Sequence, residues 1–158
     1  MKKLLMIATL VAICSFTAQA QEQGDIRATA SVVYGLDIEE AGLNIDAEYL
    51  FTDKISGGAS YTTYFVPDGL SFSEINIDGR YYFASAGAQV YALAGIQIAR
   101  AEVDLGVFGS VSSSDSGLNV GVGALFPVAD KIGIRGQAKY TIGGFEQLVI
   151  QGGVAFMF

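Results

Sequence analysis

The sequence predicts an all-β protein: an eight-stranded antiparallel up-and-down transmembrane β-barrel, preceded by a cleaved signal peptide. Three observations predict this class. Apolar and polar residues alternate with period 2, turn residues divide the alternating segments, and 51% of the residues are hydrophobic although the chain is acidic. After residue 20 no apolar run approaches the roughly 20 residues of a membrane helix, which leaves the closed barrel as the spanning structure.

The chain divides into a signal peptide, 1–20, and one outer-membrane barrel domain, 21–158. Lys2 and Lys3 form the basic start of the signal. An apolar core follows, and Ala18-Gln19-Ala20 is the expected cleavage site.

Cleavage leaves a chain without cysteine or histidine. Cys14 is read as an apolar residue of the signal, because Ile13 is larger than the small residue that precedes a lipid-acceptor cysteine. Loss of Lys2 and Lys3 changes the formal charge from −7 to −9, which does not suit nucleic acid. Without imidazole or thiolate, catalytic triads and imidazole-ligated metals are excluded. We therefore expect no enzyme activity, no catalytic residue, no metal and no cofactor.

The eight expected strands have lengths close to the ~9–11 residues that a tilted strand needs to span a bilayer. In chain order they are 26–36, 43–52, 55–66, 73–84, 89–103, 118–126, 132–142 and 148–158.

An apolar face opposes a polar one in each of the first four strands. The first places alanine, valine and tyrosine opposite Arg27. The second places leucine and isoleucine opposite Asp46 and Glu48. The third follows the tight turn Asp53-Lys54, and the fourth alternates isoleucine and aromatic residues with Glu74 and further polar residues.

The later strands have weaker boundaries. The fifth keeps one apolar phase until Arg100, where we expect a strand end or a bulge. The longest loop is expected at 104–117, and a turn at 127–131 separates the sixth strand from the seventh. The eighth alternates cleanly and stops on Phe158.

Aromatic residues of the apolar face gather at strand ends, which predicts two belts at the membrane–water interfaces. Tyr61 lies in the middle of its strand and is an exception. The predicted belt residues are Tyr34, Tyr49, Phe51, Phe65, Tyr81, Phe83, Phe126, Tyr140, Phe156 and Phe158.

Charged residues of both signs share the inward face. Side chains roughly fill the lumen of an eight-stranded barrel, so these charges must be paired or hydrated. We expect Arg135 and Lys139 to reach acids of the second and fourth strands. The predicted lumen charge network is Arg27, Asp46, Glu48, Glu74, Asp78, Arg80, Arg135 and Lys139. It is read as an occluding polar core, with a narrow ion path or a catalytic carboxylate pair as alternatives.

The alternating strands and the aromatic end of 148–158 resemble small eight-stranded outer-membrane barrels of the OmpA-transmembrane, OmpX and opacity-protein type, which are porin-family proteins of the cell envelope. The resemblance covers 21–158 and rests on architecture rather than on a local motif. It implies a place in the bacterial outer membrane among lipid and lipopolysaccharide, a monomer, and insertion by the barrel-assembly machinery through the last strand. Small barrel enzymes rely on histidine, which this chain lacks.

The resulting function hypothesis is a non-enzymatic integral outer-membrane barrel with a structural or surface-interaction role. The alternatives are a narrow porin-like channel for ions or small solutes and a soluble periplasmic lipocalin-like binding barrel. The acids of the outer loops have three interpretations: divalent-cation bridges to lipopolysaccharide phosphates, a partner site, or a solvated surface. These acids are Asp37, Glu39, Glu40, Asp104 and Asp115.

Overall fold

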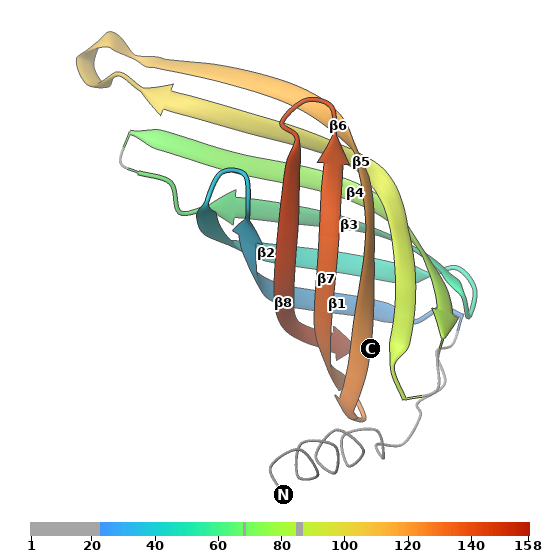
Figure 1. The fold of residues 1–158 in the computed structure, drawn as a ribbon. Helices are drawn as coiled ribbons and strands as arrows, with labels where there is room; N and C mark the ends of the chain where they lie inside the picture. The colour runs from blue at the N-terminus through green and yellow to red at the C-terminus, as the bar shows by residue number, and fades with distance from the viewer. Residues whose placement is uncertain (1–22, 68, 85–86) are drawn as a thin grey trace, which may run out of the picture.

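A computed structural model describes residues 23–67, 69–84 and 87–158, so the predicted signal peptide lies outside the described residues. Eight antiparallel strands follow one another around a closed barrel, and β1 pairs with β8 (Figure 1). The predicted eight-stranded antiparallel barrel is confirmed. The strands are β1 (Ile26–Gly35), β2 (Glu40–Leu50), β3 (Ile55–Tyr64), β4 (Leu70–Ala84), β5 (Gln89–Asp104), β6 (Ser110–Ala129), β7 (Ile132–Ile142) and β8 (Gln147–Met157). Within the described ranges, no helix is long and apolar enough to cross a membrane.

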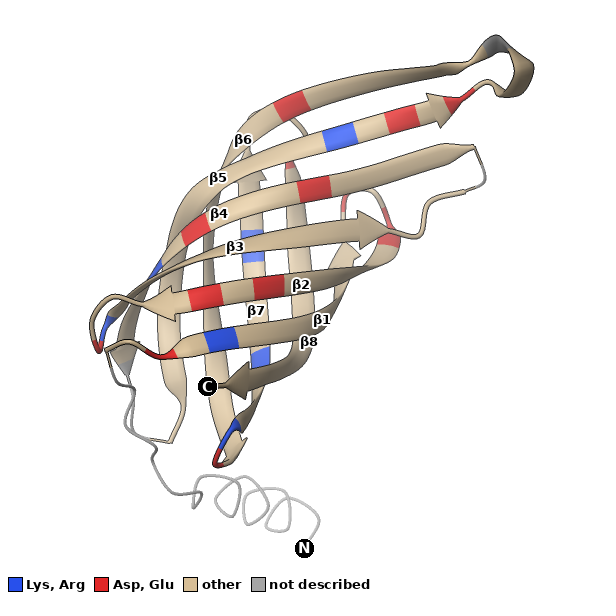
Figure 2. Ribbon diagram, turned by 180° about the vertical axis from the view of Figure 1, so that it is seen from behind, with Lys and Arg blue, Asp and Glu red and all other residues tan. Residues whose placement is uncertain are grey.

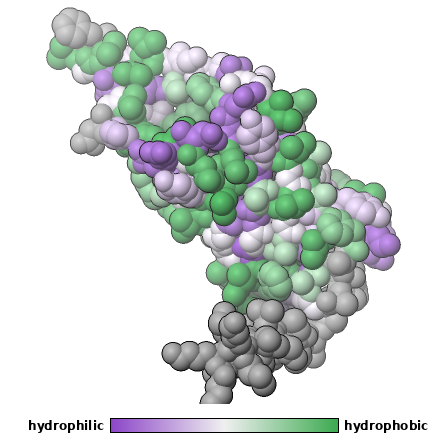
Figure 3. Space-filling view, in the orientation of Figure 1, coloured by the Kyte–Doolittle hydropathy of each residue, from purple (hydrophilic) through white to green (hydrophobic). Residues whose placement is uncertain are grey.

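Burial alternates residue by residue along β1 and along most of β2 and β7, as expected when one strand face points into a lumen. The outward positions carry most of the large apolar side chains, among them Val32, Ile45 and Ile134. Figure 3 shows hydrophobic side chains over much of the visible face of the barrel, interspersed with hydrophilic ones. The barrel therefore has a polar interior and an apolar exterior, the reverse of a soluble protein.

Two expectations about the fifth and sixth strands are wrong. β5 runs through Arg100 to Asp104 and pairs with β6 without a register shift, so there is neither a strand end nor a bulge at Arg100. The expected loop 104–117 is mostly strand, because β6 begins at Ser110 and the short 3-10 helix η1 (Gly106–Phe108) lies at the hairpin tip.

The register shifts of the described strand pairs lie near the opposite end of the barrel. One falls between Tyr82 and Ala84 in β4, and the other between Pro127 and Ala129 in β6. The expected turn at 127–131 is therefore shorter, because residues 127–129 still belong to β6.

Strands β4, β5 and β6 contain 15, 16 and 20 residues, whereas the other five contain 10 or 11. Their extra length extends past the barrel at the end away from the start of β1 and the end of β8 (Figure 1). We name residues 70–73, 100–104 and 110–114 the projecting sheet.

Candidate functional site: the filled lumen

The middle of the lumen holds a cluster of two carboxylates and two guanidinium groups, drawn from three strands. Asp46 and Glu48 come from β2, Arg80 from β4 and Arg135 from β7. Asp46 accepts from Arg80 Nη2 at 2.5 Å and from Arg135 Nη1 at 2.8 Å. Glu48 contacts Arg135 Nη2 and lies 3.5 Å from Arg80 Nη1. All four side chains are buried, and their ion pairs connect β2 with β4 and with β7 across the lumen.

Hydroxyl groups and aromatic rings complete the surroundings of this cluster. Ser56 Oγ and Tyr82 OH donate to Glu48 Oε1 at 2.5 and 2.6 Å. The guanidinium carbons of Arg80 and Arg135 lie 6.0 and 5.8 Å from the ring centre of Tyr91. Because buried charges are costly when unpaired, these contacts explain how the cluster is accommodated in the barrel interior.

Arg27 lies beside this cluster and has no ion pair within 4.0 Å among the described residues. Its Nη1 donates to Tyr82 OH at 3.1 Å, and its guanidinium carbon lies 5.4 Å from the Tyr82 ring centre. Since Tyr82 in turn donates to Glu48, Arg27 is linked to the carboxylate through the tyrosine.

The remaining predicted lumen residues lie in a layer nearer the outer end. Lys139 Nζ donates to Asn76 Oδ1 at 2.6 Å, so its closest partner is an amide rather than the expected carboxylate. Asp78 accepts from Asn119 Nδ2 at 2.9 Å, and Glu74 accepts from Gln147 Nε2. The structure thus buries all eight residues, but it places them in two layers rather than in one set of ion pairs. Figure 2 shows these charges distributed over several strands.

An apolar cluster lies toward the outer end of the lumen, next to the polar layer that contains Glu74. Its buried members are Val33, Tyr64, Phe72, Ala99 and Val149. The Phe72 ring lies 5.3 Å from Tyr64 and 5.4 Å from Phe145, which comes from the β7–β8 connection. We name this group the mouth cluster. Its Tyr64 hydroxyl accepts a hydrogen bond from Gln147 Nε2 at 3.2 Å, which joins the cluster to the polar layer.

Several residues that contact the lumen charges lie outside the predicted charge network. They are Ser56, Tyr82, Tyr91, Asn76, Asn119 and Gln147. Strand parity could identify Tyr82, because it shares a face with Arg80 and Asp78. Tyr91 likewise has the parity opposite to the outward Ala92 and Ala94. Neither tyrosine is predicted to face the lumen, because an aromatic residue is expected on the lipid side.

All ten predicted belt residues lie on the outside of the barrel, with between 41% and 72% of their surface exposed. Tyr49 of β2 pairs with Ile26 at the start of β1, and Phe156 of β8 pairs with the nearby Ala28, so these rings share one end. Tyr34 and Phe65 lie at the other end, near Ala41. This outward placement contradicts the soluble lipocalin-like alternative, which needs the aromatic face to point inward.

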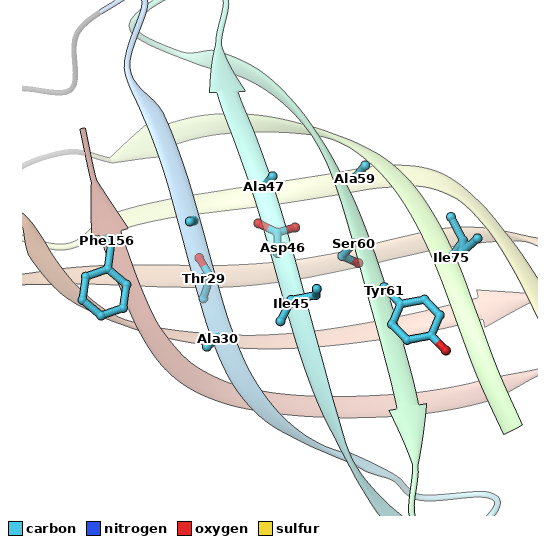
Figure 4. Close-up of a pocket in the computed structure, with 11 residues that line it drawn as sticks. Thr29, Ala30, Ile45, Asp46, Ala47, Ala59, Ser60, Tyr61, Ile75 and Phe156 are labelled. Carbon is cyan, nitrogen blue, oxygen red and sulfur yellow. The ribbon is translucent and has the colours of Figure 1, made fainter. Parts of the chain in front are cut away.

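A shallow groove of about 590 Å³ crosses the outside of β1, β2 and β3 (Figure 4). Its floor is a single hydrogen-bonded row of Ala28, Ala47 and Ala59, and larger side chains such as Tyr61 and Phe156 border it. The groove follows from the small residues in this row and belongs to the apolar face of the wall.

An apolar exterior, an interior of paired charges and a closed set of strands define an integral membrane β-barrel. Residues 6–158 match the family model of the outer membrane protein beta-barrel domain, and the chain belongs to this family. No protein of curated function matches the chain.

Solved structures show the same fold. The N-terminal β-barrel domain of Pseudomonas aeruginosa OprF has 18% sequence identity and a TM-score of 0.71, over 87% of this chain and 100% of that one. Neisserial surface protein A has 19% identity and a TM-score of 0.65, over 85% and 95%. The Yersinia pestis attachment invasion locus protein Ail has 18% identity and a TM-score of 0.57, over 86% and 99%.

Proposed function

We propose that this protein is a non-enzymatic integral barrel of the bacterial outer membrane with a structural or surface-interaction role and a closed lumen. The observation that carries the proposal is the double filling of the lumen. The carboxylate–guanidinium cluster of Asp46, Glu48, Arg80 and Arg135 spans its middle, and the mouth cluster lies above it. We further propose that residues 1–20 direct export and that the last strand is read by the assembly machinery.

Single-channel recording in a planar bilayer tests the closed lumen. The mature barrel and its Glu48→Ala and Arg135→Ala variants are expected to carry no steady current, because the mouth cluster still blocks the path when the charge cluster is weakened. Ile45→Ala, on the lipid-facing side of the same strand as Glu48, is the matched control for effects of truncation alone. Each protein is first shown to be folded by its faster migration without boiling.

Discrete current steps from the wild-type barrel, or steps opened by either lumen variant but not by Ile45→Ala, would overturn the closed-lumen proposal. The protein would then be assigned to the second candidate function, a narrow porin-like channel.

One observation favours that second candidate. Several buried polar atoms of the described lumen have no hydrogen-bond partner, among them Oε1 of Gln89 and Oγ1 of Thr29. Buried polar groups are almost always hydrogen-bonded, so these atoms indicate sites for ordered water in the lumen. A chain of such waters is the structural basis that a narrow ion path would need.

The charge of the outer end limits which ligands a surface-interaction role could involve. Ail has been solved in complex with the heparin analogue sucrose octasulfate, a polyanion. The present chain carries a formal charge of −7, and its outer loops are acidic, so repulsion disfavours a similar ligand here. No group of three or more acidic side chains in the described part of the chain is arranged to hold a metal ion, which argues against cation bridging at a preformed site.

A further inference from the structure

The inner face of the projecting sheet is apolar and open. Leu70 of β4 pairs with Val103 of β5, and Val103 pairs with Val111 of β6, so the three side chains form one row on one face. They are 49%, 40% and 62% exposed. Phe72 has the same strand parity as Leu70, so the row continues the face that lines the mouth cluster.

The hairpin tip extends this apolar surface. Leu105 is half-exposed, and Val107 in η1 is 96% exposed. Apolar side chains gather at the projecting end of the molecule in Figure 3. We name Leu70, Val103, Leu105, Val107 and Val111 the apolar strip.

The apolar strip does not face the bilayer. At the same height, the opposite face of the sheet carries Ser71, Glu102 and Ser112, which form one polar row. The bilayer lies on that opposite side of the wall, where the isoleucines of β4 and β5 begin two rows lower, at Ile75 and Ile98. Lipid therefore does not account for the apolar strip.

The surroundings of the strip are acidic. Among the described residues, the unburied acids of the outer end are Asp37, Glu39, Glu40, Glu102, Asp104, Asp115 and Glu146. Asp115 shares the inner face with Val111 and lies two rows below it. Among the described residues of this end, the unburied basic residue is Arg100, on the outer face, where it pairs with Glu102 at 3.2 Å. Figure 2 shows this excess of red over blue.

We propose that the apolar strip and the acids around it bind a cationic amphipathic segment of an extracellular polypeptide. This inference rests on the proposed surface-interaction role and names the chemistry of the partner. Apolar side chains of the segment cover Leu70, Val103 and Val111, and its lysine or arginine side chains meet the carboxylates. A second copy of this chain does not fit, because two acidic outer ends repel each other.

The absence of cysteine from 21–158 allows a test by site-specific labelling. Ser113 lies on the inner face, in the row of Phe72 and Ala101, whereas the adjacent Ser112 lies on the outer face. Ser113→Cys and Ser112→Cys, each labelled with a polarity-sensitive dye, are placed in phosphatidylcholine nanodiscs. The probe is a synthetic amphipathic Lys/Leu peptide, and the control peptide has glutamate at every lysine position.

The Lys/Leu peptide is expected to shift the dye emission at position 113 and not at position 112, while the Glu/Leu peptide shifts neither. The double change Val103→Ser and Val111→Ser is expected to weaken binding about tenfold, and 0.5 M salt to weaken it further. The folded state of each variant is checked by its unboiled migration.

Equal responses at positions 112 and 113, equal binding to empty nanodiscs, or an unchanged affinity of the Val103/Val111 variant would each overturn the inference. If the barrel migrates as folded and carries no current, but the Lys/Leu peptide does not shift the dye emission at position 113, this inference alone is overturned. A conducting wild-type barrel removes the closed-lumen proposal and leaves the peptide result to be judged by itself.

Discussion

The same three strands, β4 to β6, reverse the polarity of their two faces along their length. In the barrel wall, Ile77 and Ile96 point outward, whereas Asp78 and Asn76 point into the lumen. In the projecting sheet, serine and charged residues point outward, whereas Leu70 points inward. Strand pairing continues across the boundary without a register shift between β5 and β6. The comparison shows that the backbone sets only the alternation, and that lipid or water decides which face is apolar.

The largest difference between the two regions is expected for their ion pairs. Arg135→Met leaves Asp46 and Glu48 buried beside one remaining guanidinium, which should lower the free energy of unfolding by about 3–5 kcal/mol. Arg100→Met breaks only the exposed pair with Glu102 and should cost less than about 1 kcal/mol. Urea titrations in lipid vesicles, followed by the shift in migration, measure both. Similar losses would show that the lumen is hydrated like a surface.

The outward faces are expected to differ next. Ile77→Arg puts a charge on the apolar band and should lower the free energy of unfolding by about 2–4 kcal/mol. Ser73→Arg, on the same face of the same strand and beside Arg100, should change it by less than about 0.5 kcal/mol. The same titrations apply. A large cost at Ser73 would mean that the bilayer reaches higher than the isoleucines indicate.

The smallest of the three differences in the free energy of unfolding is expected between two positions on the inner face of β4. Phe72→Ala removes a ring from the mouth cluster and should cost about 2–3 kcal/mol, somewhat below the ~3–5 of an enclosed core because the cluster is open above. Leu70→Ala, two residues earlier on the same face, should cost less than about 1 kcal/mol. Equal costs would place Leu70 inside the cluster and shorten the apolar strip.

Much of the wall can be predicted from alternation alone. Where one face meets lipid, a strand carries a regular apolar signal, and parity then assigns the inward residues. Alternation therefore assigns Asp46, Glu48, Arg80 and Arg135 to the inward face, and all four side chains are buried in the lumen. Their individual partners cannot be predicted in this way, because strand parity fixes a direction but not which side chains meet across the lumen.

The sequence pattern does not predict the strands of the projecting sheet, and the reason is physical. The prediction requires an apolar outward face, so the outward Arg100 reads as a break and the serine-rich segment 110–116 as a loop. Above the lipid, an outward residue faces water, and the apolar signal moves to the other face. Val103 and Val111 carry that signal, two valines separated by a loop in sequence but paired in the sheet.

The pairing of β1 with β8 has a consequence for the order in which the molecule can form. Arg27 faces Met157 in that pairing. The free backbone edge of β1 is therefore hydrogen-bonded only after β8, the last strand to be synthesised, is available. A chain that lacks the final strand has two strand edges with unpaired backbone N–H and C=O groups. The hydrocarbon of a bilayer cannot hydrogen-bond these groups. Closure is therefore a late, long-range event, slow relative to hairpin formation, and the unfinished chain must be kept from pairing with its neighbours until then.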